Sequence, residues 1–171
     1  MKYCSVSTVN HEKAIHFPSI IENVYDVFLK EGCDLELSSP FSNKNIMVIN
    51  GDELENKFCF MDGRNLSSKN KSVDVIFIAK QDLIGLNLIF VELKLNSKKN
   101  FYTLNKSSFR DKTDNSQKAM GSSVPSSKKH YIVFNSRVIN EAKRFLFRQN
   151  PVLDNDFVAL TIVDLYRKFF I

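Results

Sequence analysis

The fold is decided by the stretch 73-VDVIFIAKQDLIGLNLIFVELKL-95, in which a short link joins two apolar runs. Both runs are rich in β-branched and aromatic residues and have the length of a strand. Gly85 lies in the link, where a hairpin would turn. The stretch therefore predicts a buried antiparallel hairpin.

Three charged residues interrupt this hairpin at one end: Asp74 at its entrance, and Glu92 and Lys94 near its exit. A turn around residues 83 and 84 places Asp74 across from Glu92 and Leu93. Because successive side chains of a strand point to opposite faces, Glu92 and Lys94 share a face. We therefore expect two carboxylates and one ammonium group to converge beside an apolar sheet.

The composition predicts one globular domain. A chain of 171 residues with 43% apolar residues can bury a core without disulfides. Its three cysteines are an odd number without CxxC spacing, which argues against a disulfide framework or zinc knuckle and favours free thiols in a reducing compartment. The chain begins without an apolar signal region, and no run approaches the roughly 18 apolar residues of a membrane span. We expect a cytoplasmic protein that does not enter a membrane.

The positive charge is concentrated directly after the hairpin. Residues 94–129 contain nine basic and two acidic residues, a net charge of +7, whereas the rest of the chain carries −2. A basic segment that begins at the charged end of a buried hairpin is typical of a groove for a polyanion. A solvated lysine-rich loop is the alternative interpretation.

The rest of the sequence predicts helices around a sheet. An apolar stripe with i, i+3, i+4 spacing indicates a helix from Pro18 to the residue before Gly32. The other expected elements are strands at 33–37, 45–50, 57–61 and 130–135, loops at 62–72 and 96–113, a short helix at 115–120, a helix at 138–148 and a last helix from Asp154. These elements predict an α/β (α+β) fold with a central mixed β-sheet flanked by helices. We expect a single domain over 1–171, with its core at about 18–135 and a C-terminal helical part at 136–171.

Asp74 followed by Glu92-Leu93-Lys94 resembles the motif of the PD-(D/E)XK nuclease superfamily, which includes restriction endonucleases, Holliday-junction resolvases and RecB-like nucleases. The order of helix, strands, helix and strand over 18–135 is similar too, although Val73 stands where the family name has proline. The resemblance implies a restriction-endonuclease-like core and a Mg²⁺-dependent (or Mn²⁺-dependent) phosphodiesterase.

These residue types suit phosphodiester hydrolysis on chemical grounds as well. A divalent cation clamps the phosphate oxygens and lowers the pKa of a bound water. Asp74 and Glu92 can supply the carboxylate ligands that Mg²⁺ prefers, and Lys94 can orient the water and stabilise the charge that builds on phosphorus. The alternative is a purely structural ion pair of Lys94 with Asp74 or Glu92, although such buried pairs are poor stabilisers.

Two further residues come from the resemblance. Family members carry an acid on the first helix, which makes Glu22 a third candidate metal ligand, although Ser19 and Glu22 also fit a capping box. RecB-like members carry a glutamine on the helix after the ExK strand, and Gln117 takes that place. The tyrosine that follows four residues later in that group is Gly121 here.

The predicted function is hydrolysis of phosphodiester bonds, in DNA in preference to RNA, by a toxin, a phage or anti-phage defence nuclease, or one subunit of a larger machine. The alternative is a catalytically inactive nuclease-like module that binds nucleic acid or a protein partner within a larger complex. The apolar end Phe169-Phe170-Ile171 must pack on the core or contact a partner, including a second copy of the chain. The residues expected to contact nucleic acid are Lys98, Lys99, Lys106, Arg110, Lys112, Gln117 and Lys118.

Overall fold

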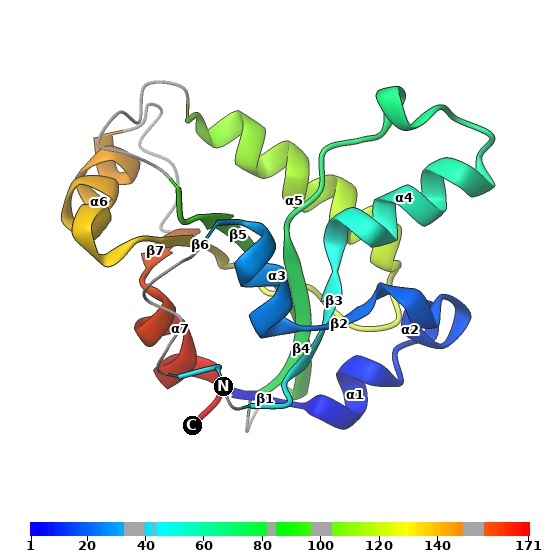
Figure 1. Ribbon diagram of the computed structural model, residues 1–171, viewed down its shortest axis with the longest axis horizontal. Coiled ribbons are helices and arrows are strands. Elements are labelled where there is room, and N and C mark those ends of the chain that lie inside the picture. The colour runs from blue at the N-terminus through cyan, green and yellow to red at the C-terminus, as the bar shows by residue number, and fades with distance from the viewer. Residues whose placement is uncertain (33–39, 43, 82–84, 97–103, 149–155) are drawn as a thin grey trace.

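A seven-stranded mixed sheet forms the centre of the protein (Figure 1). The computed structural model describes residues 1–32, 40–42, 44–81, 85–96, 104–148 and 156–171. The strand order is β2-β3-β4-β5-β6-β7, and β1 pairs with the part of β4 that β3 leaves free. The described strands are β1 (Lys2–Tyr3), β2 (Ile21–Asn23), β3 (Met47–Asn50), β4 (Val75–Gln81), β5 (Gly85–Lys94), β6 (His130–Phe134) and β7 (Phe157–Leu160). The described α-helices are α1 (Ser5–Val9), α2 (Glu12–His16), α3 (Val24–Lys30), α4 (Gly51–Met61), α5 (Lys106–Met120), α6 (Ile139–Arg148) and α7 (Ile162–Phe169).

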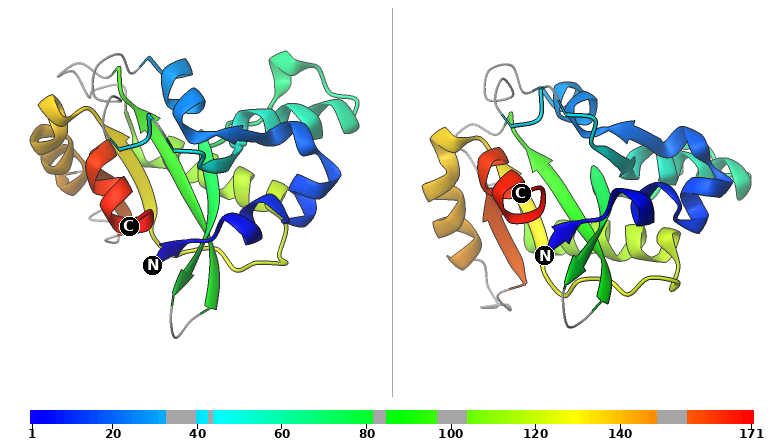
Figure 2. Two further views of the ribbon diagram at one scale, coloured as in Figure 1. Left: turned by 60° about the horizontal axis from the view of Figure 1, so that its bottom comes forward. Right: turned by 90° about the horizontal axis from the view of Figure 1, so that it is seen from below.

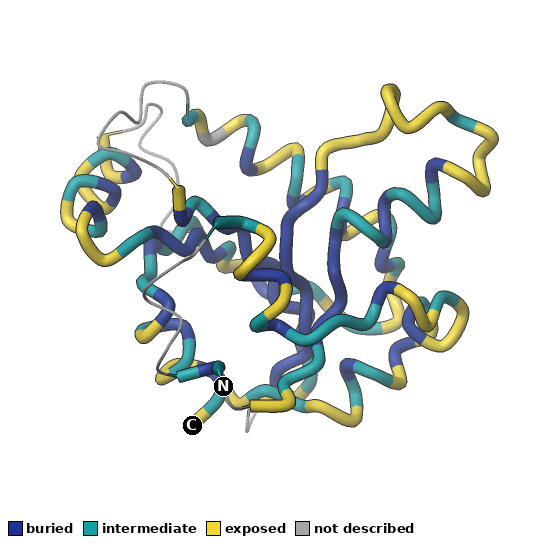
Figure 3. Tube along the Cα trace, viewed as in Figure 1, coloured by how far each residue is buried: buried dark blue, intermediate teal, exposed yellow. Residues whose placement is uncertain are grey.

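Helices cover both faces of the sheet (Figure 2). Val75 and Phe77 of β4 pack with α3 and α7 on one face. Ile76 and Ile78 point the other way, where β4 packs with α4 and α5, and α6 covers the neighbouring part of that face. The central strands are buried along most of their length (Figure 3). The predicted α+β class, a mixed sheet flanked by helices, is confirmed.

The predicted hairpin is the longest antiparallel pair in the described part of the sheet. Its register runs from Val75 opposite Val91 to Gln81 opposite Gly85. The predicted turn at 83 and 84 lies outside the described residues. Strand β6 then pairs in parallel with β5, and β7 in parallel with β6. Because residues 91–94 of β5 are the ones that pair with β6, the charged end of the hairpin lies beside β6.

The helix expected from Pro18 to the residue before Gly32 is only partly correct. Residues Pro18–Ile20 form a 3₁₀ turn, and residues 21–23 pair with β3 as strand β2. Helix α3 begins after Asn23, whose side chain accepts a hydrogen bond from Tyr25 N. The capping box predicted for Ser19 and Glu22 is therefore wrong, because pairing with β3 holds Glu22 in an extended strand.

The strand predicted at 57–61 is also wrong, because these residues end helix α4. Asn50 caps this helix by accepting a hydrogen bond from Glu53 N. The apolar residues of 57–61 suggested a strand, but Cys59 is buried whereas Phe60 and Met61 are exposed. The strand predicted at 45–50 is confirmed as β3, and the strand predicted at 33–37 lies outside the described residues.

The segment after the hairpin contains more helix than expected. Helix α5 begins at Lys106, inside the loop predicted for 96–113, and it includes the short helix predicted at 115–120. Asn105 caps it through Ser108 N, and a stripe of buried residues follows it on one side: Phe109, Thr113, Ser116 and Met120. Residues 97–103 lie outside the described residues.

The C-terminal part is not purely helical. The strand predicted at 130–135 and the helix predicted at 138–148 are confirmed as β6 and α6. The helix predicted from Asp154 is wrong over 157–160, which form β7, because these residues complete the sheet beside β6. A capping box between Thr161 and Asp164 then begins α7. The sheet thus extends beyond the core predicted at about 18–135.

The apolar C-terminus packs mainly on the protein's own core. Phe169 is buried, Phe170 is half-buried, and both rings contact Phe77, whereas Ile171 is exposed. Cys4 and Cys59 are free thiols, as expected, and Cys33 lies outside the described residues. Among the described helices, none has the length and apolar character required to cross a bilayer.

Candidate metal centre

The charged end of the β4–β5 hairpin brings Asp74 and Glu92 together, as predicted. Asp74 directly precedes β4, and its carboxylate accepts a hydrogen bond from Leu93 N. Both carboxylates are buried, with exposures of 7% for Asp74 and 3% for Glu92. Val91 and Leu93 pack into the α3/α7 face. Glu92 and Lys94 therefore lie on the opposite face, toward α5.

Glu92 binds two ammonium groups through one oxygen. Lys94 Nζ donates to Glu92 Oε1 from the same strand, and Lys112 Nζ reaches the same oxygen from α5 at 2.6 Å. The other oxygen, Oε2, is buried and has no hydrogen-bond partner in the described part of the chain. A buried carboxylate oxygen without a partner is rare and often marks the place of a water or an ion.

Two carboxylates that the sequence had not suggested lie beside Asp74. Glu31 and Asp52 each bring an oxygen toward Asp74, and these three oxygens all lie within 4.8 Å of one another. One divalent cation can draw three carboxylate oxygens this near to one another into its coordination shell.

Glu31 reaches the cluster because the end of α3 packs against the residues that follow β5. The Asn96 side chain donates a hydrogen bond to Glu31 O at 2.9 Å. Gly32 has a φ of +81°, and a Cβ there would lie 2.0 Å from Asn96 Nδ2. Glycine therefore permits both the turn and the close approach that hold Glu31 near the exit of the hairpin.

Asp52 is placed by the close contact between α4 and the entrance of β4. Gly51 N donates to Asp74 O at 3.1 Å, and a Cβ on Gly51 would lie 1.9 Å from Val73 O. The Ser72 hydroxyl donates to Asp52 Oδ1 at 2.6 Å. Because no side chain fits at Gly51, the first turn of α4 can lie directly against the backbone beside Asp74.

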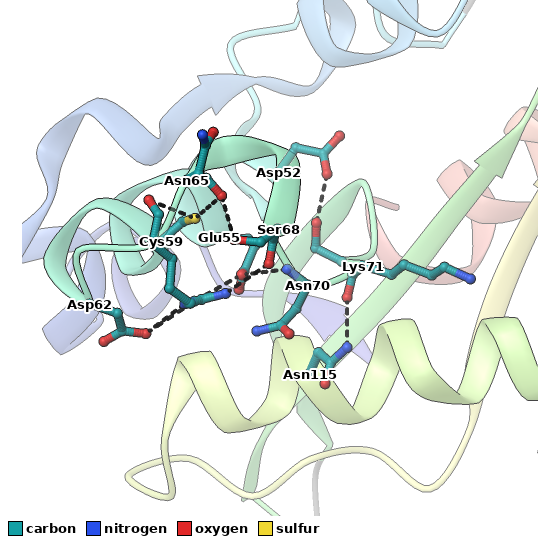
Figure 4. Close-up of polar contacts among 11 residues, drawn as sticks. Asp52, Glu55, Cys59, Asp62, Asn65, Ser68, Asn70, Lys71 and Asn115 are labelled. Atoms are coloured by element: carbon teal, nitrogen blue, oxygen red, sulfur yellow. Dashed lines mark hydrogen bonds and ion pairs between the residues drawn. The ribbon is translucent and has the colours of Figure 1, made fainter.

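Helix α5 is joined to the same segment. Ser116 Oγ accepts a hydrogen bond from Val73 N at 3.0 Å, and Asn115 Nδ2 donates to Lys71 O at 3.1 Å. Figure 4 shows Asp52 on α4 and Asn115 on α5 on either side of the segment that contains Lys71. These contacts fix the helix that carries Lys112 relative to the hairpin.

Burial dominates the electrostatics of the cluster. Burial raises the pKa of Asp74 to about 8, and the negative charge of Glu92 adds to this increase, while Lys112 opposes it. Burial also raises the pKa of Glu31, with Lys94 opposing. Burial lowers the pKa of Lys112, but its pairing with Glu92 outweighs this effect and the net shift is upward. Without a cation, the site thus opposes full ionisation of its acids.

The other predicted site residues lie at different places. Glu22 is on β2, pairs with Lys30 and accepts a hydrogen bond from Asn50 Nδ2 at 2.7 Å, and it is not one of the carboxylates that gather around Asp74. Lys112 lies inside the site, whereas Arg110, Gln117 and Lys118 are exposed on α5. Lys106 begins α5, and Lys98 and Lys99 lie outside the described residues.

Sequence reasoning missed Glu31 and Asp52 for identifiable reasons. The helix was expected to begin at Pro18, six residues before α3 begins at Val24, which drew attention to Glu22 rather than to the acid before Gly32. Asp52 was hidden because α4 was not expected. The sequence Asn50-Gly51-Asp52-Glu53 did carry a signal, since asparagine followed by a glutamate three residues later is typical of a helix N-terminus.

Comparison with protein-family models, with curated proteins and with solved structures gave no match. Four carboxylates and three ammonium groups gather at this end of the sheet, because Lys69 lies 3.8 Å from Asp52 in addition to the two lysines at Glu92. The carboxylates can hold a hard divalent cation through oxygen ligands. Lys94 and Lys112 can then stabilise negative charge on a substrate bound beside that cation.

Proposed function

We propose that this protein is a metal-dependent nuclease that hydrolyses phosphodiester bonds, with DNA as the preferred substrate. The observation that carries the proposal is the pair of buried carboxylates Asp74 and Glu92, with Lys94 bound to Glu92 and with the half-buried Glu31 and Asp52 beside Asp74. The basic segment 94–129, which includes α5, begins at this cluster. A structural ion pair would not need this excess of carboxylates over ammonium groups.

The donor set fits Mg²⁺ or Mn²⁺. Asp74 would hold the ion together with Glu31 and Asp52, and Glu92 offers its unpartnered oxygen nearby. When bound, the ion would polarise the phosphate and lower the pKa of a water. Lys94 would orient that water and stabilise the negative charge on the phosphate oxygens. Its ammonium group is held for this role by Glu92 and by Leu93 O at 3.1 Å.

The first experiment measures cleavage of labelled single-stranded and double-stranded DNA and RNA with Mg²⁺, Mn²⁺ or EDTA. We expect cleavage that requires the metal and falls at least about 100-fold in Lys94→Ala. Lys80→Ala is the matched control, because Lys80 is an exposed lysine at the far end of the hairpin. Equal rates for wild type and Lys94→Ala would overturn the catalytic proposal and favour the inactive nucleic-acid-binding module.

A second experiment tests the metal centre without cleavage. Mn²⁺ should raise the thermal midpoint of the wild type, because it binds the folded state. It should not raise the midpoint of Asp74→Asn/Glu92→Gln. Asp26→Asn is the control, since Asp26 is exposed in the first turn of α3. An equal rise in all three proteins would place the ion elsewhere.

A further inference from the structure

We propose that Lys112 is an exchangeable cation: its ammonium group occupies Glu92 in the metal-free protein, and metal binding transfers it to a phosphate of the bound nucleic acid. This inference rests on the proposed nuclease function. It makes Lys112 both a competitor of the metal and a phosphate-binding residue, and it would allow tight substrate binding only when the metal is in place.

The first observation is the difference between the two lysines at Glu92. Lys94 is held twice, because its ammonium group donates to Glu92 and to Leu93 O. Lys112 has Glu92 as its only hydrogen-bond partner among the described residues. Of the two ammonium groups, Lys112 is therefore the one that can leave without breaking a backbone contact.

The second observation is where Lys112 lies. It extends from α5 into a cluster of acids, and its charge interacts with Glu92, Asp74 and Asp52. Asp74 and Asp52 are two of the three carboxylates that would surround a divalent ion. An ammonium group and a divalent ion repel each other at such distances in a partly buried site. A metal bound at Asp74 therefore weakens the hold of Glu92 on Lys112.

The third observation is that the Lys112 side chain can reach solvent. Its side chain is 21% exposed, and its flexible stem lets the ammonium group swing toward solvent. Arg110 and Lys118 are exposed on other sides of the same helix. A phosphate bound beside the metal would thus meet the released ammonium group at the edge of the metal centre.

The exchange can be observed directly by NMR of the lysine ammonium groups in ¹⁵N-labelled protein. Signals are assigned with Lys112→Arg and Lys94→Arg, and Mg²⁺ is added without substrate. We expect the Lys112 signal to shift and broaden as the group becomes exposed to water, while the Lys94 signal persists. An unchanged Lys112 signal at Mg²⁺ concentrations that raise the melting midpoint would overturn the exchange. A midpoint that no divalent ion raises would overturn the metal centre itself.

Binding of a fluorescent DNA oligonucleotide provides a second readout, with Ca²⁺ as a cation chosen to limit cleavage. Lys112→Met should weaken binding at least about 5-fold with Ca²⁺ and leave it unchanged in EDTA, and Lys112→Arg should restore it. Lys118→Met is the matched control and should weaken binding equally in both conditions. An equal loss for Lys112→Met with and without Ca²⁺ would overturn the proposal, because a simple basic contact does not depend on the metal.

Discussion

At the scale of single residues, Asp74 and Glu92 are adjacent acids with opposite effects on stability. Asp74 has few compensating contacts for its charge, and burial together with Glu92 raises its pKa to about 8. Glu92 instead pairs with both Lys94 and Lys112. Neutralising Asp74 should therefore stabilise the metal-free fold, whereas neutralising Glu92 should destabilise it.

The effect of Asp74 depends on pH. The unfolded chain ionises Asp74 near pH 4, whereas the folded protein keeps it protonated until about pH 8. Stability is therefore lost as the pH rises between these values. We expect Asp74→Asn to gain stability over wild type by at least about 2 kcal/mol between pH 5 and pH 8.5. Urea unfolding in EDTA measures this difference. If the difference in unfolding free energy between Asp74→Asn and wild type does not increase with pH, the raised pKa of Asp74 is contradicted. Asp26→Asn should differ from wild type by the same amount at both pH values.

Glu92→Gln should lower the free energy of unfolding by about 2 kcal/mol at pH 6, where Asp74 is still protonated. The reason is that two partly buried ammonium groups lose their shared carboxylate. Urea unfolding at pH 6 without metal provides the measurement. Glu53→Gln is the matched control, because Glu53 lies in the first turn of α4 away from the two lysines. A variant as stable as wild type would show that the pairing contributes nothing.

At the scale of elements, the approach of α4 to β4 depends on one glycine. A Cβ at Gly51 would lie 1.9 Å from Val73 O, so Gly51→Ala must push α4 away from Asp74. We expect a loss of about 3 kcal/mol in unfolding free energy, together with weaker Mn²⁺ binding because Asp52 moves. Gly63→Ala is the comparison variant, because it introduces backbone strain without a clash. Gly63 has a φ of +65° but no atom within 4 Å of its Cβ position, so it should cost only about 1 kcal/mol and leave Mn²⁺ binding unchanged.

Strands formed by short, continuous apolar runs could be predicted from the sequence. The hairpin and β6 were predicted because their runs of β-branched and aromatic residues suit only a buried strand. Helix α4 was mistaken at 57–61 because its apolar residues cluster in its last turns, two of them exposed. Strand β2 was missed because pairing with β3, which a sequence does not display, overrides the helical spacing of Ile20 and Val24.

The candidate site was predicted where it depends on one local pairing. Asp74 meets Glu92 and Leu93 because the hairpin register alone brings them together. Glu31 follows α3 and Asp52 lies in the first turn of α4, and their approach depends on close packing at Gly32 and Gly51. An error of six residues in the start of a helix is enough to choose Glu22 instead of Glu31. The spacing of residues in the sequence therefore does not predict a site whose residues come from separate helices and strands.

At the scale of the whole molecule, the uneven charge predicts how DNA binds. The segment 94–129 carries +7 whereas the rest of the chain carries −2. We expect Arg110→Glu/Lys118→Glu to weaken DNA binding in EDTA at least about 10-fold and to reduce the slope of log K against log salt by about 2. Lys143→Glu/Arg144→Glu on α6 is the matched control, with the same change of charge at exposed residues. Fluorescence anisotropy at several salt concentrations measures both the affinity and the salt slope. If the α5 and α6 variants weaken DNA binding equally, a binding face on α5 is contradicted.

The contact between the two ends of the chain affects when the protein can fold. The Tyr3 ring lies 5.0 Å from the Phe170 ring and 5.9 Å from the Phe77 ring, and Phe169 covers Phe77 from the other end of the chain. On the ribosome, the central strands are made long before the aromatic residues that complete their core. The core can close only once residues 169 and 170 have left the exit tunnel.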